Sequence, residues 1–275
     1  MVSQEQRRRQ LAREKFLRQQ QRRTSARRRA RVRNSAIASV LGVIVIGTVA
    51  LYTTDVLKGG DDKAKAGADT TPSAPPTSKA PDPCAKPAAG SAKKLSWKKE
   101  PAMTIDTSAK YTMKLATTCG DIDVALKTAA APHTVNSFDF LAGKGYFDHT
   151  KCHRLTTSDI YVLQCGDPQG TGMGGPGYTL PDENLKDKSL KANTYPAGTV
   201  AMANTGQKHT GGSQFFLVYK DSPLPPQYTP FGTVSDAGMK VLQKIAAAGA
   251  QPADPTQNTA PNATVVINKA TVTKS

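Results

Sequence analysis

The stretch from Ala197 to Tyr219, AGTVAMANTGQKHTGGSQFFLVY, contains two short apolar runs separated by a polar segment with several glycines. Short apolar runs bounded by turn residues are typical of β-strands that are buried in a sheet. We therefore predict strands over 198–203 and 213–219. The stretch points to a domain that is built mainly from short strands.

The flanking sequence continues this pattern. Apolar and polar residues alternate in YTMKLATT (111–118) and again in DIDVALK (121–127), with a turn at Gly120 between them, which predicts a β-hairpin. Further strands are predicted at 152–155, 160–164 and 263–273.

Two segments have helical spacing. In HTVNSFDFLAGKG (133–145), Val135, Phe138 and Leu141 share one face. In 236–249, capped by Ser235 or Asp236 and stopped by Gly249, the residues predicted to be buried are Met239, Leu242 and Ile245. About eight short strands and two helices indicate one antiparallel barrel or sandwich whose open ends are covered by the helices.

The N-terminal part has a different composition. Residues 1–33 contain 13 Arg and Lys against two Glu, a net charge of +11, and residues 34–54 contain no charged residue. An apolar segment of this length can span a bilayer, and basic residues ahead of it favour the cytoplasmic side. We expect a basic cytoplasmic tail (1–33) and a single-pass transmembrane signal-anchor (34–54) in the cell membrane, with cleavage after 48–50 as the alternative.

Orientation in the membrane is a sufficient reason for the basic tail, so no binding to nucleic acid is expected. Residues 55–103 are rich in Pro, Ala and Lys, which predicts a flexible linker. The folded extracytoplasmic domain is then expected over 104–275, and nothing in the sequence indicates more than a monomer.

Motifs that suggest other chemistry lack the sequence context that this chemistry requires. The segment 170–175, GTGMGG, fits a dinucleotide-binding pattern, but Pro176 follows where the pattern requires a helix. The four cysteines lack the spacing of a zinc site, and no Ser, His and Asp are arranged as a triad. Neither a metal nor a cofactor is predicted.

An even number of cysteines outside the cytoplasm is typical of disulfides, and four cysteines allow three connectivities. Cys152 and Cys165 flank a predicted hairpin and could pair across it, which would leave Cys84 to join the linker to Cys119. The sequence does not decide among the three.

Three segments in order, HRLTTSDIYVLQCGDPQGTG (153–172), the opening stretch, and PFGTV (230–234), resemble the cyclophilin-type peptidyl-prolyl cis-trans isomerases. The resemblance covers about residues 113–273, and the chain as a whole is similar to bacterial, membrane-anchored members of the family. It implies a mainly β fold, an eight-stranded antiparallel closed barrel capped by two α-helices, with a substrate groove outside the barrel. The implied partners are proline-containing unfolded or secreted polypeptides.

Rotation about an X-Pro amide is slow, with a barrier of about 20 kcal/mol. In the twisted state the prolyl nitrogen regains a lone pair, so a hydrogen-bond donor aimed at it favours that state. The resemblance gives the catalytic role to Arg154. The substrate-binding residues that it implies are Gln164, Asn204, Gln214, Ala203, Tyr161, Val162, Phe216, Leu224 and Tyr228.

The sequence also departs from the family pattern. Nine residues separate Arg154 from Gln164 where the commonest members have seven, so Tyr161 and Val162 could each be displaced by one position. Pro223 stands where many members carry Trp, which puts cyclosporin binding in question, and Tyr228 stands where they carry His. The alternative hypothesis is a non-catalytic module that binds proline peptides or acts as a holdase.

Overall fold

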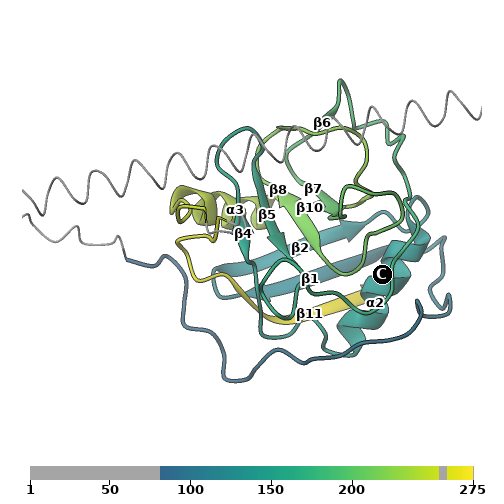
Figure 1. Ribbon diagram of the computed structural model, residues 1–275, viewed down its shortest axis with the longest axis horizontal. Helices are drawn as coiled ribbons and strands as arrows, with labels where there is room; N and C mark the ends of the chain where they lie inside the picture. The colour runs from purple at the N-terminus through teal and green to yellow at the C-terminus, as the bar shows by residue number, and fades with distance from the viewer. Residues whose placement is uncertain (1–80, 254–258, 275) are drawn as a thin grey trace, which may run out of the picture. The chain divides into compact units, whose positions relative to one another are not determined.

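The computed structural model describes residues 81–253 and 259–274, in which one curled sheet is flanked by two helices (Figure 1). The sheet has nine strands in the order β3-β11-β1-β2-β10-β7-β8-β5-β4, and each neighbouring pair is antiparallel. Its strands are β1 (Tyr111–Thr117), β2 (Gly120–Leu126), β3 (Thr150–Lys151), β4 (Arg154–Leu155), β5 (Val162–Cys165), β7 (Thr199–Met202), β8 (Phe215–Val218), β10 (Pro230–Val234) and β11 (Val266–Lys274). A separate ribbon pairs β6 (Thr194–Tyr195) with β9 (Ser222–Pro223).

The predicted mainly β, antiparallel fold with two helices is confirmed, but the sheet is curled and is not closed by a ladder. Its edge strands, β3 and β4, are separated in the chain only by Cys152 and His153. Cys152 and His153 belong to neither ladder, so β3 and β4 count as two strands and the sheet has nine. Isolated backbone hydrogen bonds, such as that from Leu155 N–H to Thr259 O (2.7 Å), join the segment of β3 and β4 to the residues ahead of β11.

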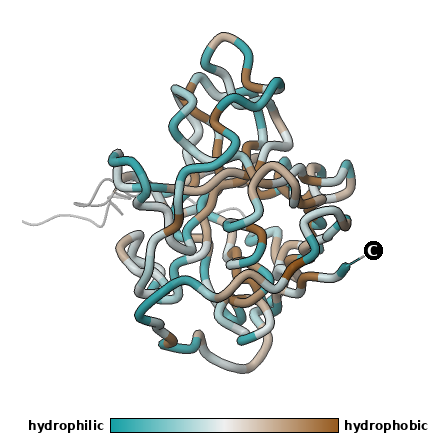
Figure 2. The backbone as a smooth tube through the Cα atoms, turned by 90° about the vertical axis from the view of Figure 1, so that its right-hand side faces the viewer, coloured by the Kyte–Doolittle hydropathy of each residue, from teal (hydrophilic) through white to brown (hydrophobic). Residues whose placement is uncertain are grey.

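The helices pack on the sheet at the places the periodicity predicts. Helix α2 (Pro132–Gly143) buries Val135, Phe138 and Leu141, and helix α3 (Asp236–Ala247) is capped by the Ser235 side chain, which accepts from Gly238 N–H. Met239, predicted to be buried, is only partly so. The apolar residues in brown concentrate in the middle of the domain in Figure 2.

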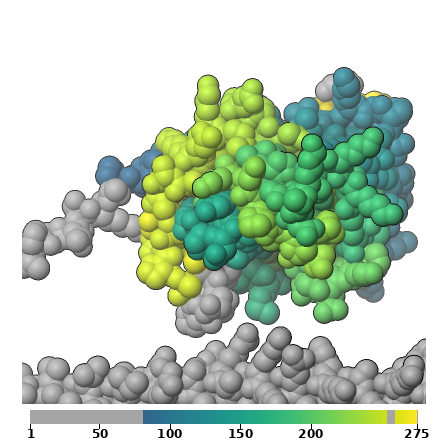
Figure 3. Space-filling view, turned by 90° about the horizontal axis from the view of Figure 1, so that it is seen from above, coloured from purple at the N-terminus to yellow at the C-terminus, as the bar shows by residue number. Residues whose placement is uncertain are grey.

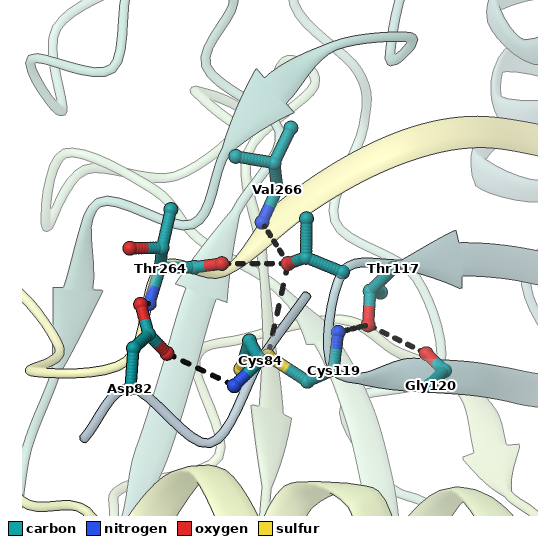
Figure 4. Close-up of a disulfide and its surroundings, with 8 residues drawn as sticks. Asp82, Cys84, Thr117, Cys119, Gly120, Thr264 and Val266 are labelled. Carbon is teal, nitrogen blue, oxygen red and sulfur yellow. Dashed lines mark hydrogen bonds between the residues drawn. A yellow bond between two sulfur atoms is a disulfide. The ribbon is translucent and has the colours of Figure 1, made fainter. Parts of the chain in front are cut away.

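Residues 81–103, which we call the N-terminal strap, lie on the domain and run under the sheet towards α2 (Figure 1). A disulfide joins Cys84 to Cys119 in the turn between β1 and β2, and Asp82 accepts from Thr264 N–H (2.9 Å) beside it (Figure 4). Trp97, further along, packs on Phe140 with ring centroids 5.1 Å apart.

The strap corrects the expected start of the folded domain at residue 104, because side chains and a covalent bond already hold residues from Cys84 on. A second disulfide joins Cys152 to Cys165, so the structure selects the pairing that the hairpin argument suggested. Neither α2 nor α3, the helices of the described part, has the length and hydropathy for a membrane span. The predicted tail (1–33), signal-anchor (34–54) and most of the linker lie outside the described residues.

Candidate functional site

The candidate site lies on the outer face of strands β4, β5, β7 and β8. Side chains alternate across a sheet, so Leu163 and Cys165 of β5 enter the main core while Val162 and Gln164 face outward. Arg154 on β4 lies opposite Gln164, and Gln164 lies opposite Phe216 on β8. The register of three strands therefore brings these residues together. Figure 3 shows one side of the domain, on which the central part of the chain, in teal and green, lies between the yellow C-terminal part and the blue part that comes early in the chain.

A chain of hydrogen bonds links the polar side chains on this face. Arg154 Nη1 donates to Gln164 Oε1 (3.2 Å), Gln164 Nε2 donates to Gln214 Oε1 (2.9 Å), and Gln214 Nε2 donates to the carbonyl of Gly174 (2.8 Å). Each amide uses its oxygen on one neighbour and its nitrogen on the next. The orientation of Arg154 is thus coupled to that of both glutamines.

Arg154 is a half-buried cation. None of the ion pairs between described residues involves it. Burial lowers the pKa of its guanidinium below the ordinary value, while proximity to Tyr228 acts in the opposite direction. Guanidinium groups stay protonated in proteins, so the site keeps a desolvated positive charge whose remaining N–H groups are available to a ligand.

An apolar cluster lies on the same outer face as Gln164. Its buried members are Val162, Tyr195, Ala201, Phe216 and Val218, and its partly buried members are Ile160, Leu190, Ala203, Leu224 and Tyr228. The rings of Phe216 and Tyr228 meet edge to face with centroids 5.4 Å apart. The cluster stands apart from the main core, and its partly buried members give the face that carries Arg154 an apolar surface.

Tyr195, a buried member of this cluster, fixes the backbone of Tyr228. Its hydroxyl donates to the Tyr228 carbonyl (2.7 Å) and accepts from the Tyr228 N–H (3.1 Å). Burial raises the pKa of Tyr195 to about 12, so the hydroxyl stays protonated and can donate. Tyr228 is thereby fixed next to Phe216.

A groove of about 560 Å³ adjoins the hydrogen-bonded glutamines. Gln164, Gln214, Ala203 and Asn204 form part of its wall, and the glycine-rich segment 172–179 forms much of the rest. The Asn204 amide donates to the Gln227 carbonyl (2.8 Å) and accepts from Gly206 N–H (2.9 Å). Asn204 therefore shapes the loop at the rim as well as facing the groove.

The glycine-rich segment is organised by a buried carboxylate. Asp167 is fully buried and accepts from the backbone N–H groups of Gln169 (2.7 Å), Thr171 (2.9 Å) and Gly172 (2.7 Å). Burial raises the pKa of Asp167, but these bonds and one from Gly174 outweigh it, and the pKa lies below its ordinary value. The N–H groups that would bind a phosphate are thus engaged by Asp167, which agrees with the rejection of a dinucleotide site.

The predicted residues are placed on this face with one exception. Arg154, Gln164 and Gln214 form the hydrogen-bonded chain; Val162, Phe216, Ala203, Leu224 and Tyr228 belong to the apolar cluster; and Asn204 is in the groove wall. Tyr161 is the exception, because it packs edge to face on Tyr219 (5.9 Å) with Lys220 Nζ 4.4 Å from its ring centroid. Ile160 joins the cluster instead.

Ile160, Leu190 and Tyr195 were not predicted. Side chains two residues apart share a face of a strand, so counting back from Gln164 leads to Val162 and then to Ile160. Alternation could therefore have indicated Ile160. Leu190 and Tyr195 reach the cluster from a separate part of the chain, in or next to the β6–β9 ribbon, and no local pattern marks them.

The family described as "Cyclophilin type peptidyl-prolyl cis-trans isomerase/CLD" matches residues 112–272. The "Probable peptidyl-prolyl cis-trans isomerase B" of Mycobacterium leprae is 48% identical over 149 residues, which are 51% of this chain and 50% of that protein. The "Peptidyl-prolyl cis-trans isomerase B" of Bacillus subtilis is 43% identical over 115 residues, 42% of this chain and 76% of that protein.

The chain spans about half the length of the mycobacterial relatives that it matches. Among solved structures, a cyclophilin-type peptidyl-prolyl cis-trans isomerase of Cryptosporidium parvum is 27% identical, with 60% of this chain and 99% of that one covered and a TM-score of 0.48.

Proposed function

Because the chain belongs to the cyclophilin-type peptidyl-prolyl cis-trans isomerase family, we propose that it accelerates rotation about X-Pro bonds in unfolded or secreted polypeptides. The observation that carries this proposal is the half-buried Arg154, which pairs with no acid of the described residues and is held by Gln164 beside an apolar cluster. A proline ring fits such a cluster, and a cation next to it can act on the bond that precedes the ring.

The reaction breaks no covalent bond, so the site has to favour one conformation. In the planar amide the nitrogen lone pair is delocalised, and in the twisted amide it is localised and basic. A guanidinium N–H directed at that nitrogen binds the twisted state more strongly than either planar state, which lowers the barrier. Gln164 accepts from Arg154 Nη1 and so fixes the direction of the remaining donors.

The other residues hold the peptide on both sides of the rotating bond. Phe216, Val162 and Leu224 offer apolar surface to the proline ring, and Gln214 and Asn204 offer amide groups to the peptide backbone. No nucleophile, metal or cofactor is needed for this chemistry, since all charge changes are internal to the amide.

Isomerase activity is tested by NMR exchange spectroscopy on an Ala-Pro-Phe peptide with the full-length protein. Cross-peaks between the cis and trans signals that appear only with substoichiometric protein support the proposal. Peptide binding without an increase in the exchange rate would refute catalysis and favour the proline-binding or holdase alternative.

We also propose a cell-membrane location, with residues 1–33 cytoplasmic and the catalytic domain outside. This rests on the charge and hydropathy of residues 1–54 and fits the two disulfides, which persist in oxidising compartments. Protease treatment of intact cells tests it: loss of the domain with survival of the N-terminal tail is expected, and full protection of the domain would contradict it.

A further inference from the structure

We propose that Trp97, in the N-terminal strap, is a positioning residue for the peptide groove and acts through Gln214. The inference rests on the proposed function, because it concerns how the same groove holds a peptide. Trp97 lies in the segment that the sequence assigned to a flexible linker, and it is the one tryptophan of the chain.

The strap and the glycine-rich wall of the groove are in direct contact. The backbone N–H of Trp97 donates to the carbonyl of Pro176 (2.8 Å). A Cβ atom placed on the next residue, Gly177, would lie 2.6 Å from the Trp97 carbonyl oxygen and 2.2 Å from Ser96 Oγ. Only a glycine allows this approach, so the wall is packed against the strap without a gap.

The first route from Trp97 to Gln214 runs through this wall. Pro176 and Gly174 both line the groove, and the Gly174 carbonyl accepts from Gln214 Nε2 (2.8 Å). Asp167 fixes the start of the same segment, whereas Trp97 holds its far part at Pro176. Loss of the strap contact would release the carbonyl that orients Gln214.

The second route runs through the aromatic packing. The Trp97 indole lies against Phe140 (5.1 Å between centroids) and Tyr146 (6.0 Å). The Tyr146 hydroxyl is within hydrogen-bond distance of Ser213 Oγ (3.0 Å), and Ser213 Oγ donates to the Gly166 carbonyl (2.7 Å). Ser213 directly precedes Gln214, so the indole supports the backbone that carries this glutamine.

Both routes end at Gln214 and the groove wall, and Arg154 lies one step further away. Arg154 bonds to Gln164 Oε1, whereas Gln214 engages Gln164 through Nε2. A disturbance at Trp97 should therefore weaken the grip on the peptide more than it weakens the action on the rotating bond. The expected signature is a change in KM with little change in kcat.

The test compares kcat and KM of the full-length wild type, Trp97→Ala and Trp97→Phe on two peptides. One is Ala-Pro-Phe, and the other carries additional residues on both sides of the same core. For Trp97→Ala we expect KM for the longer peptide to rise about tenfold, with kcat for both and KM for the short peptide within about twofold of wild type. Both variants keep the backbone N–H that donates to Pro176, so the comparison isolates the ring. Trp97→Phe retains an aromatic ring against Phe140 and should stay close to wild type.

Two further variants separate positioning from stability. Leu242→Ala truncates a buried side chain of α3, which packs on β2, and should lower Tm without changing the ratio of the two KM values. Phe140→Ala removes the support of the indole from the α2 side and should raise KM for the longer peptide in the same direction as Trp97→Ala, even if the latter fails to fold.

Equal KM changes for both peptides, an effect on kcat alone, or no effect in Trp97→Ala and Phe140→Ala would overturn the proposal. If the wild type shows no isomerase activity, the proposed function fails by itself. The affinities of the two peptides, measured by calorimetry, then decide the role of Trp97 by the same comparison.

Discussion

Replacement of Arg154 by Ala should abolish most of the isomerase activity while it leaves the fold nearly unchanged. The side chain is half-buried, and its hydrogen bond to a described side chain is the one to Gln164. Loss of one donor aimed at charge that develops in a transition state costs about 10²–10³-fold in kcat. We therefore expect kcat/KM to fall by about two to three orders of magnitude, with most of the loss in kcat.

The structural cost of the same change should be small. Gln164 loses one hydrogen bond, worth about 1 kcal/mol, but its amide nitrogen keeps Gln214 as partner. No acid is left unpaired by the loss of the cation among the residues described here, and the desolvation that lowers the pKa of Arg154 is relieved. Tm should therefore move by a few degrees at most.

The assay is exchange NMR on Ala-Pro-Phe, with circular dichroism for Tm. Arg154→Lys is the matched control: it keeps the charge but loses the planar fork of donors, so intermediate activity is expected. Our reasoning would be refuted if Arg154→Ala kept more than about half of the wild-type kcat, since the donor would then contribute under 1 kcal/mol to the transition state.

Three other predictions follow from the surroundings of the site. Asp167→Asn removes the charge that holds the backbone N–H groups of Gln169, Thr171 and Gly172, where the chain enters the groove wall. The free energy of unfolding should therefore fall by about 2–3 kcal/mol in urea titrations, and an unchanged midpoint would contradict this. Burial lowers the pKa of His153 in the folded state, so just below pH 6.5 the unfolded state binds more protons than the folded state. The free energy of unfolding should therefore be at its full value above that pH and decline on acidification, and the decline should be larger in wild type than in His153→Gln. The double variant Cys152→Ser/Cys165→Ser opens a loop closed at a sequence separation of 13 residues and should lose about 3 kcal/mol of stability, measured against wild type with both disulfides oxidised.

Much of the fold could be predicted because it is encoded locally. Alternation with period two marks β1 and β2, and Ser235 marks the start of α3. The start of α2 was less visible, since its first N–H groups donate to the carboxylate of Glu183, about 50 residues away in the chain. A cap supplied from a distant loop leaves no trace in the helix's own sequence.

The site was predictable where motif and register agree, as at Arg154, Gln164 and Phe216. At Tyr161 the two additional residues between Arg154 and Gln164 left a displacement by one position open, and the structure shows it: Tyr161 packs on Tyr219, and Ile160 joins the cluster. The strap was predicted only in part. The Cys84–Cys119 link was one of the pairings that the sequence left open, but the linker-like composition gave no sign of the packing of Trp97 on Phe140.

The position of the Cys84–Cys119 bond determines how mechanical tension would reach the folded domain. A pull on the chain ahead of Pro81 passes through the covalent bond into the turn between β1 and β2. The strap residues after Cys84, including Trp97, then carry none of the applied force, so the pull does not separate them from the groove wall. With this disulfide reduced, the same pull would act along the strap, first on the bonds of Ala85 to Thr118 and of Ala88 to Asn268, and then on the bond of Trp97 to Pro176.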